Sequence, residues 1–292
     1  MITCYFLCNW GETSEELLNR FKLITSNNIG VWKNSIKGTS DLNTAECVIT
    51  LEGFPNNYNY NLIKNKQIIC FPREPNGKKN WENLYLKYGY TYNNCIHVFT
   101  TPSFISKTYD FLNKLSYCRP EKKLSAVMSN KNLNINYHVR IQFLINLSKK
   151  YPNLCDMYGF GWTNELGSSY KGELGSYHRN KTNVKTKYNA LIDYDYSICI
   201  ENCTKKNYFT EKFTDAILCW TIPIYHGCPN IDEYFPEDCY YAIDINNENS
   251  LEIVNNIVKN PISEKNIEAL KIARELILNK YNLWNYIYEI VK

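Results

Sequence analysis

The sequence lacks any block of like charges. Of its 292 residues, 33 are Lys or Arg and 29 are Asp or Glu, which gives a formal net charge of +4, and both signs are spread along the chain. Proteins that bind nucleic acid usually gather basic residues into a patch or stripe. The dispersed charge therefore predicts no nucleic-acid partner, while a local site for an anionic ligand stays open.

The chain also has no long apolar run at its start. The opening residues, MITCYFLCNWGE, carry no basic segment, and their apolar stretch is too short for a signal peptide or a membrane anchor. We therefore expect a cytoplasmic protein with no transmembrane segment. The sequence also shows no internal repeat at the period of a solenoid.

The cysteines do not complete a metal-binding pattern. Most of the 12 stand singly inside apolar runs, as free core thiols do. The closest pairs, Cys4/Cys8 and Cys199/Cys203, have no second pair with His nearby to complete a four-ligand zinc site. The pattern indicates reduced thiols in an intracellular protein and no bound metal.

What the sequence does contain is the composition of a soluble globular protein. Hydrophobic residues make up 44% and charged residues 21%, and the length suits two domains of about 100–150 residues each. In the first hundred residues, short apolar strands alternate with polar or helical pieces. Strand, helix and strand in this order predict a parallel sheet with covering helices. The expected strands are 2–8, 46–53, 66–74 and 94–101, and the expected helix is 14–24.

A polar, Pro-containing segment at 116–124 predicts a linker, after which the strand and helix rhythm restarts. We expect an α/β protein with two βαβ halves facing each other across a cleft. The predicted parts are a domain at 1–118, a domain at 119–265 and a C-terminal helix at 266–292 that packs back across both halves. In the second half we expect strands at 124–130, 155–162, 196–202, 221–227 and 240–245, and helices at 138–151 and from Thr210 onward.

The stretch after Ile200 has the chemistry of an anion site. Thr210 is a good N-cap for a helix that follows a strand, and ligands of parallel sheets bind at the carboxyl ends of strands. A helix N-terminus attracts an anion, and Lys212 in the first turn adds a full positive charge. This suits a pyrophosphate, while Glu211 can accept hydrogen bonds from sugar hydroxyls. The simpler alternative is that Glu211 only complements the helix dipole and Lys212 is solvated.

The same stretch contains a longer motif, made of Tyr208-Phe209-Thr210-Glu211-Lys212, Asp215-Ala216, Ile222-Pro223-Ile224-Tyr225, Gly227, Pro229 and Tyr234-Phe235-Pro236. This motif resembles the donor-binding signature of the α-1,3/1,4-fucosyltransferases, glycosyltransferase family 10. The segment Ile200-Glu201-Asn202 is similar to the family's Phe-Glu-Asn, and the rest of the chain fits more loosely. The resemblance implies the GT-B fold, with two Rossmann-like domains, inversion at the anomeric carbon and no metal in catalysis.

The resemblance also implies roles for single residues in binding the donor. Arg140 and Lys212 match contacts to the diphosphate, and an Arg fork suits phosphate oxygens. Tyr208 and Glu211 match residues that hold the ribose or the donor sugar, and Asn202 matches an Asn beside the donor. Two alternatives stay open at this stage: Arg140 as an ordinary helix-surface residue, and Asn202 as a residue that only caps its loop.

An inverting transfer needs a carboxylate that takes the proton from the acceptor hydroxyl. Glu74 follows an apolar strand and resembles the family's Glu-x-Pro segment, so it is the predicted catalytic base. Its surroundings depart from the family's aromatic-rich pattern, and the adjacent Arg73 offers an alternative as a simple ion-pair partner. Glu52, at the end of the preceding strand, is the substitute candidate.

Three other signals carry less weight. Asp193-Tyr194-Asp195 spells the Asp-x-Asp of metal-dependent glycosyltransferases, but it precedes a strand instead of following one. His226 stands where relatives often have Trp or a small apolar residue, a departure that affects the donor side. The loop at 167–186 has the length of a lid over the nucleotide.

The prediction is an inverting glycosyltransferase that moves L-fucose from GDP-fucose to a hydroxyl of a glycan acceptor, with no cofactor. Two alternatives stay open: the same fold with another nucleotide-sugar donor, and a sugar-binding module that has lost catalysis. The absence of a membrane stem is more like bacterial or viral members of the family, which would place the protein in the cytoplasm, or in the host cytoplasm for a virus.

Overall fold

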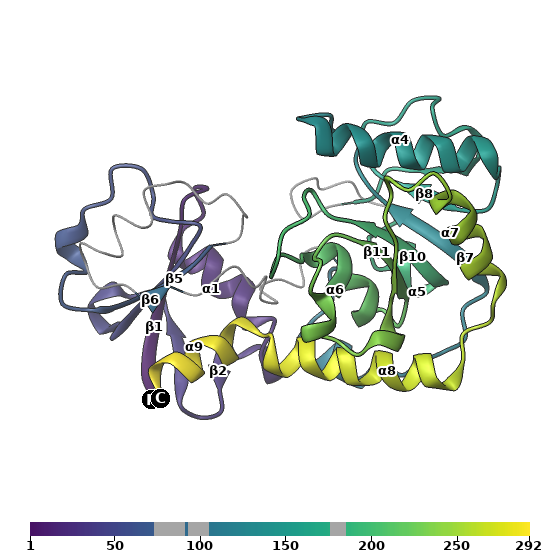
Figure 1. The fold of residues 1–292 in the computed structure, drawn as a ribbon. Coiled ribbons are helices and arrows are strands. Elements are labelled where there is room, and N and C mark those ends of the chain that lie inside the picture. The colour runs from purple at the N-terminus through teal and green to yellow at the C-terminus, as the bar shows by residue number, and fades with distance from the viewer. Residues whose placement is uncertain (73–90, 93–104, 176–184) are drawn as a thin grey trace. The chain divides into compact units, whose positions relative to one another are not determined.

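The computed structural model describes residues 1–72, 91–92, 105–175 and 185–292 (Figure 1). The chain divides into two compact units, each with its own sheet. The division near residue 114 falls just before the expected linker, and the last residues belong to the first unit and not to a separate segment. The first unit comprises Met1–Pro102, Lys107–Asn113 and Ile277–Lys292, and the second comprises Ser103–Ser106 and Lys114–Leu276.

The sheet of the first unit has the order β2-β3-β1-β4-β5-β6 and is parallel except for the β2–β3 pair. The expected strands at 2–8 and 46–53 are confirmed, as is the described part of the strand expected at 66–74, whereas the strand expected at 94–101 lies outside the described residues. The strands are β1 (Ile2–Cys8), β2 (Val31–Trp32), β3 (Ile36–Thr39), β4 (Cys47–Leu51), β5 (Gln67–Phe71) and β6 (Thr91–Tyr92).

Local sequence explains the elements of the first unit. All five residues of β4 are buried, as expected for a central strand of a covered parallel sheet. Helix α1 begins after a capping box, in which Thr13 and Glu16 each bind the other's backbone N–H. The C-terminal segment packs here, because the Trp284 indole donates to the Phe21 carbonyl over 2.9 Å. The helices are α1 (Ser14–Lys22), α3 (Tyr109–Lys114) and α9 (Leu283–Val291), with 3₁₀ turns at Ser26–Asn28, Leu42–Thr44 and Tyr60–Leu62.

The sheet of the second unit is parallel throughout and has the order β12-β11-β10-β7-β8-β9. Its strands are β7 (Lys122–Val127), β8 (Asp156–Tyr158), β9 (Tyr170–Gly172), β10 (Tyr194–Ile200), β11 (Ile222–His226) and β12 (Tyr241–Ala242). Its helices are α4 (Ile135–Lys150), α5 (Asn189–Ile192), α6 (Glu211–Leu218), α7 (Ser250–Lys259) and α8 (Glu264–Glu275). A π-helical turn at Leu276–Lys280 follows, and 3₁₀ turns lie at Gly167–Ser169, Ile231–Glu233 and Glu237–Cys239.

The strand order of the second unit reverses between β7 and β10. From β7 the chain passes through α4 to β8 on one side, and from β10 it passes through α6 to β11 on the other. Helices α4 and α7 therefore cover one face of the sheet, and α6 and α8 cover the other (Figure 1). In open α/β sheets, such a reversal leaves a crevice at the carboxyl ends of the two strands, where ligands bind.

Aromatic packing anchors α6 in the second unit. The Phe213 ring centroid lies 4.7 Å from that of Tyr225 on β11 and 5.0 Å from that of Phe235. Ala216 and Ile217 are fully buried on the same helix. Because α6 is held by large rings on one side, the position of its N-terminus is fixed relative to β10 and β11.

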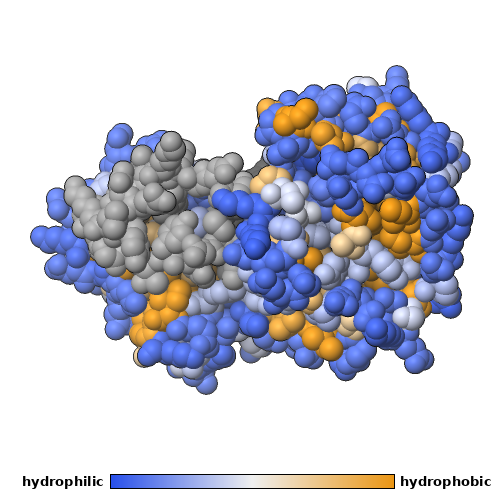
Figure 2. All heavy atoms as spheres, viewed as in Figure 1, coloured by the Kyte–Doolittle hydropathy of each residue, from blue (hydrophilic) through white to orange (hydrophobic). Residues whose placement is uncertain are grey.

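The surface is mostly hydrophilic on the face that Figure 2 shows. Two large apolar side chains near the beginning of α4, Leu133 and Ile135, have 71% and 70% of their area exposed. Across residues 1–72, 91–92, 105–175 and 185–292, no helix combines the length and apolar composition that a membrane crossing requires.

Candidate functional site

A cavity of about 480 Å³ lies at the reversal point of the second unit's sheet. Its walls come from the residues that follow β7 and β8, from the end of β10, from α4 and from the first turn of α6. Four cationic side chains and one carboxylate line it: Lys131, Arg140, Lys187, Lys212 and Glu211. The position and this charge balance favour a small anionic ligand.

The N-terminus of α6 is held by a buried carboxylate. Thr210 is the N-cap, as predicted, and its hydroxyl accepts from the Lys212 N–H over 3.3 Å. Glu201, at the end of β10, accepts from the Thr210 backbone N–H over 2.6 Å and from the Thr210 hydroxyl over 2.7 Å. Burial raises the pKa of Glu201, opposed by Lys212 and by the Thr210 hydrogen bonds. Glu201 therefore fixes the helix start from behind the cavity.

Lys212 is enclosed by oxygen atoms and is not merely solvated. Its Nζ lies 3.4 Å from Glu201 Oε2 and 3.5 Å from Glu211 Oε1, and it donates to the Thr210 hydroxyl over 3.1 Å. Burial alone would lower the pKa of Lys212, but the two carboxylates outweigh burial and raise it. The side chain thus stays charged at the cavity wall.

Arg140 is a buried residue, so its interpretation as a helix-surface side chain is wrong. It is 3% exposed, its Nη1 donates to Asn202 Oδ1 over 2.6 Å, and its guanidinium stacks 4.2 Å from the Tyr137 ring centroid. Its Nε has no hydrogen-bond partner among the described residues. Burial lowers the pKa of Arg140, partly offset by Tyr137 and Glu201. A buried, unsatisfied donor beside a cavity indicates a missing acceptor.

Lys187 and Asp215 form an ion pair that the sequence analysis did not predict. Lys187 Nζ lies 2.8 Å from Asp215 Oδ2 and donates to the Glu211 carbonyl over 3.1 Å. Asp215 is 1% exposed, and burial raises its pKa to about 6 against the opposing effect of Lys187. The pair ties the first turn of α6 to the segment before β10. The only signal in the sequence was that Asp215 belongs to the family motif.

The other predicted donor-site residues lie in different places. Asn202 does not line the cavity but holds Arg140, and Tyr208 is buried at 3% exposure away from the cavity wall. Glu74 lies outside the described residues. Glu52 follows β4 with a positive φ of 53°, and its carbonyl accepts from the Asn9 amide over 2.6 Å.

The structure also places two other residues that the sequence analysis singled out, Asp195 and His226. Asp195 pairs with Lys123 over 2.6 Å at the amino end of β10, the end opposite the cavity. His226 lines a different cavity, near Thr204 and Ile243. Within the described ranges, no cluster of three or more His, Cys, Asp or Glu side chains is arranged to hold a metal ion.

Comparison with known proteins identifies the family of the second unit. Residues 119–261 match the family model described as glycosyltransferase family 10 (fucosyltransferase) C-term. These residues form a domain of glycosyltransferase family 10. This assignment confirms the resemblance, because the matched range contains the candidate site from Arg140 to Lys212.

Three relatives share short segments with this chain. A fucosyltransferase-like protein of Arabidopsis thaliana is 37% identical over 62 residues, which are 21% of this chain and 12% of that protein. An alpha-(1,3)-fucosyltransferase of Helicobacter pylori is 39% identical over 69 residues, 24% of this chain and 13% of the relative. Alpha-(1,3)-fucosyltransferase B of Drosophila melanogaster is 29% identical over 112 residues, 32% and 24% of the two chains. The matches thus span less than a quarter of the length of each relative.

Solved structures show the fold of this chain. An alpha-glucosyltransferase in complex with UDP and DNA superposes with a TM-score of 0.51 at 8% identity, covering 99% of this chain and 98% of that one. A crystal structure of an alpha1,3-fucosyltransferase covers 95% of this chain and 83% of its own, with a TM-score of 0.48 and 17% identity. The first likeness, together with the two largely parallel sheets, confirms the predicted α/β fold with two Rossmann-like units of GT-B type.

Proposed function

We propose that this protein transfers L-fucose from GDP-fucose to a hydroxyl of a glycan acceptor, with inversion at the anomeric carbon. The buried Arg140 beside Lys212 is the observation that carries the proposal. An unsatisfied buried guanidinium N–H costs free energy, and a phosphate oxygen is the acceptor that matches it best. The family 10 domain and the names of the relatives support fucose as the transferred sugar.

The arrangement suits a diphosphate leaving group. In the transfer, the acceptor oxygen bonds to the anomeric carbon, the bond from that carbon to the phosphate oxygen breaks, and the electron pair leaves with GDP. Lys212 and Arg140 would stabilise the negative charge that grows on the diphosphate. Glu211, on the cavity wall, would accept hydrogen bonds from hydroxyls of the ribose or the donor sugar.

The proton of the acceptor hydroxyl requires a base, and Glu74 remains the predicted one, with Glu52 as the substitute. Asn202 serves as a positioning residue that holds the guanidinium of Arg140. For Tyr208, burial away from the cavity wall suggests that it supports the loop before α6, with any contact to the donor made through its neighbours.

We also propose that the reaction proceeds without a metal or other cofactor, because cationic side chains already face the place of the leaving group. A cytoplasmic location and the absence of a nucleic-acid partner belong to the same proposal. The described cysteines are free thiols, which suits a reducing compartment. Activity in excess chelator, cell fractionation and a DNA-binding titration test these three statements.

The decisive experiment is calorimetric titration of the full chain with GDP. We expect GDP to bind to the wild-type chain. Arg140→Ala should lower the affinity for GDP about 10- to 100-fold, because charge-assisted hydrogen bonds are lost. Arg140→Lys would restore only part of the affinity, because an ammonium lacks the planar fork. Lys259 is exposed in the last turn of α7 and does not line the cavity, so Lys259→Ala is the matched control for loss of one charge. Absence of GDP binding, or equal binding by Arg140→Ala, would overturn the proposal.

A panel of nucleotide sugars then tests the donor. Transfer of fucose from GDP-fucose to a glycan supports the proposal. Turnover with a UDP-linked sugar instead would assign the alternative donor class. Binding of GDP without transfer of any sugar would assign the module that has lost catalysis.

A further inference from the structure

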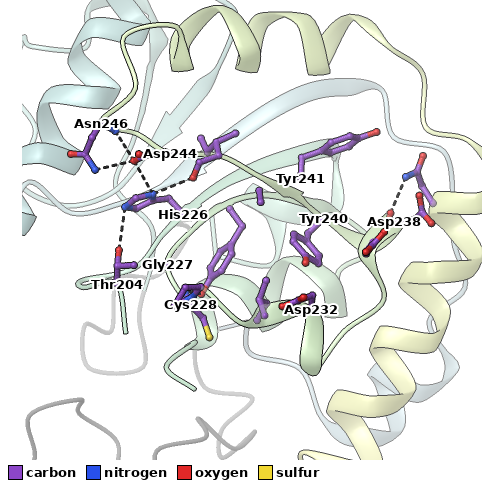
Figure 3. Close-up of a pocket in the computed structure, with 17 residues that line it drawn as sticks. Thr204, His226, Gly227, Cys228, Asp232, Asp238, Tyr240, Tyr241, Asp244 and Asn246 are labelled. Atoms are coloured by element: carbon purple, nitrogen blue, oxygen red, sulfur yellow. Dashed lines mark hydrogen bonds and ion pairs between the residues drawn. The ribbon is translucent and has the colours of Figure 1, made fainter. Parts of the chain in front are cut away.

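A second, larger cavity lies in the same unit and is separate from the candidate donor site. It measures about 850 Å³ and opens at the carboxyl ends of β11 and β12 (Figure 3). Its size falls in the usual range for ligand pockets. Arg140, Asn202, Tyr208, Glu211 and Lys212, the residues predicted for the donor, do not line it.

The charges of the two cavities are opposite. No Lys or Arg side chain is among the described residues that line the larger cavity, whereas four acidic residues are: Asp232, Glu237, Asp238 and Asp244. Asp238 forms an ion pair with Lys265 over 2.8 Å, and the Asp244 carboxylate accepts a hydrogen bond from the Asn246 backbone N–H. In the part of the chain that the structure describes, the carboxylates of Asp232 and Glu237 make no hydrogen bond or ion pair. This cavity therefore repels a diphosphate and offers acceptors to a ligand rich in hydroxyl groups.

A buried hydroxyl lines the cavity together with the acidic residues. Tyr225 is 2% exposed, and its hydroxyl accepts from the Cys228 backbone N–H over 3.0 Å. Burial and the nearby Glu201 raise the pKa of Tyr225, so the hydroxyl keeps its proton at neutral pH. A phenol that accepts one hydrogen bond can still donate another, which suits a ligand rich in hydroxyl groups.

Two half-buried tyrosines supply the flat apolar surface that a sugar ring needs. The ring of Tyr240 is braced by Phe213, with centroids 5.7 Å apart, and that of Tyr241 by Tyr196, 6.1 Å apart. In Figure 3, Tyr240 lies between the side of the cavity that carries His226 and the side that carries Asp238. Braced aromatic rings with polar edges combine apolar contact with hydrogen bonding at low entropic cost.

A third cavity lies between the larger cavity and the residues of the donor side. Thr204 and His226 line the larger cavity and also line this third one, which measures about 250 Å³ and reaches Glu201. The Thr204 hydroxyl lies 3.4 Å from His226 Nε2 (Figure 3), and Glu201 contacts Lys212 of the donor cavity. The two sites therefore lie along the same carboxyl edge of one sheet.

We propose that the larger cavity is a subsite for a neutral oligosaccharide, which holds the part of the glycan acceptor that does not react. The inference rests on the proposed function for the identity of that glycan as acceptor. Carboxylate and amide oxygens would accept hydrogen bonds from the sugar hydroxyls, and Tyr240 and Tyr241 would pack against the faces of the sugar rings. Retention of the distant part of the acceptor would raise its residence time and so favour longer glycans over short ones.

The test is a titration of the full chain with lactose, fully N-acetylated chitotetraose and maltotetraose, with the deacetylated, cationic chitosan tetramer as the charged comparison, followed by saturation-transfer NMR. We expect at least one neutral tetrasaccharide to bind more tightly than the disaccharide. The variant Asp232→Ala/Glu237→Ala should weaken it about tenfold, because hydrogen bonds to charged groups are lost. The matched control is Glu268→Ala/Glu275→Ala, which removes two exposed carboxylates of α8 that do not line the cavity.

A second variant keeps the test independent of folding. Tyr240→Phe retains the ring that Phe213 braces and removes only a hydroxyl, so it should fold normally and still weaken the tetrasaccharide. The inference is overturned if no neutral oligosaccharide binds, if the double variant binds like its control, or if only the cationic chitosan tetramer binds. A parallel titration with GDP separates the two proposals. If the full chain binds the oligosaccharide but not GDP, the proposed transferase function fails; if it binds GDP but no oligosaccharide, the proposed subsite fails.

Discussion

Arg140 on α4 and Asn202 after β10 meet through a 2.6 Å hydrogen bond across the point where the strand order reverses. The two residues are far apart in sequence, and each comes from a different βα unit. The amide oxygen of Asn202 uses one guanidinium N–H and leaves the unsatisfied Nε for another partner. The bond therefore orients the cation that we assign to the diphosphate.

Asn202→Ala should weaken GDP binding, but less than Arg140→Ala does. The variant leaves the cation in place and removes only its support, so we expect a loss of about three- to tenfold. Calorimetric titration with GDP measures it, and Asn256→Ala, on the exposed side of α7, is the control. An unchanged dissociation constant would show that Asn202 does not position Arg140.

Lys212→Ala should reduce turnover by about 100-fold, because charge stabilisation at the leaving group is lost. It should also lower the melting temperature, because buried Glu201 loses its partner. Lys212→Arg keeps the charge and separates the two effects. Steady-state kinetics with GDP-fucose and a thermal melt give both readouts, and full activity in Lys212→Ala would exclude this residue from the site.

The Lys187–Asp215 pair predicts a pH dependence of stability. The pKa of Asp215 is about 6 in the folded protein, above its ordinary value of 3.8. Between these values the folded chain holds a proton that the unfolded chain has released, so this group makes the protein less stable as pH rises from about 4 to 6. Urea unfolding of the wild type and Asp215→Asn at several pH values tests this. The wild-type stability should fall relative to the variant across that window, and a constant difference would contradict the prediction.

Gly227→Ala should destabilise the second unit and weaken GDP binding together. A Cβ at this position would lie 2.5 Å from Glu201 Cγ and 2.6 Å from the Tyr225 hydroxyl, both of which are buried. Displacement of Glu201 would move the N-cap of α6, at a cost of about 1–3 kcal/mol. Gly167→Ala is the comparison, because its Cβ meets nothing within 4 Å and only its φ of +52° is strained. A thermal melt that ranks Gly167→Ala as the more damaging change would refute the packing argument.

Glu74→Gln should abolish most of the transfer while GDP binding stays intact. Loss of a general base costs about 100- to 10,000-fold in rate. Glu52→Gln is the paired variant, and its rate should stay within a few-fold of the wild type. The reverse ranking of the two variants would assign the base to Glu52.

Local signals in the sequence were sufficient for much of the second unit. The apolar run at 196–202 predicts β10, which spans Tyr194–Ile200, and the N-cap Thr210 predicts the start of α6, because both depend on neighbouring residues. Helix α4 begins earlier than expected, at Ile135, because Asn134 caps it. β9, at Tyr170–Gly172, was missed inside the expected lid loop, since a strand of three residues has too few positions to show a period.

The residues that hold the site in place could not be predicted from the sequence, because their role depends on contacts between distant segments. Nothing near Asn202 reveals that its amide meets a guanidinium from α4, and nothing near Lys187 reveals a carboxylate on α6. The role of Glu201 had two signals, its place in the segment that resembles the family's Phe-Glu-Asn and a single carboxylate at the end of a fully buried strand. Such an acid must find partners inside the fold, and Thr210 and Lys212 supply them.

Because the strand order reverses between β7 and β10, the backbone that positions the site can stay the same while the side chains that carry the chemistry change. Any sequence that keeps this order delivers a side chain of α4 and the first turn of α6 to the same spot, from opposite faces of the sheet. A change of nucleotide or sugar then needs only new side chains at the strand tips. Divergent donors can therefore be recognised on one unchanged backbone.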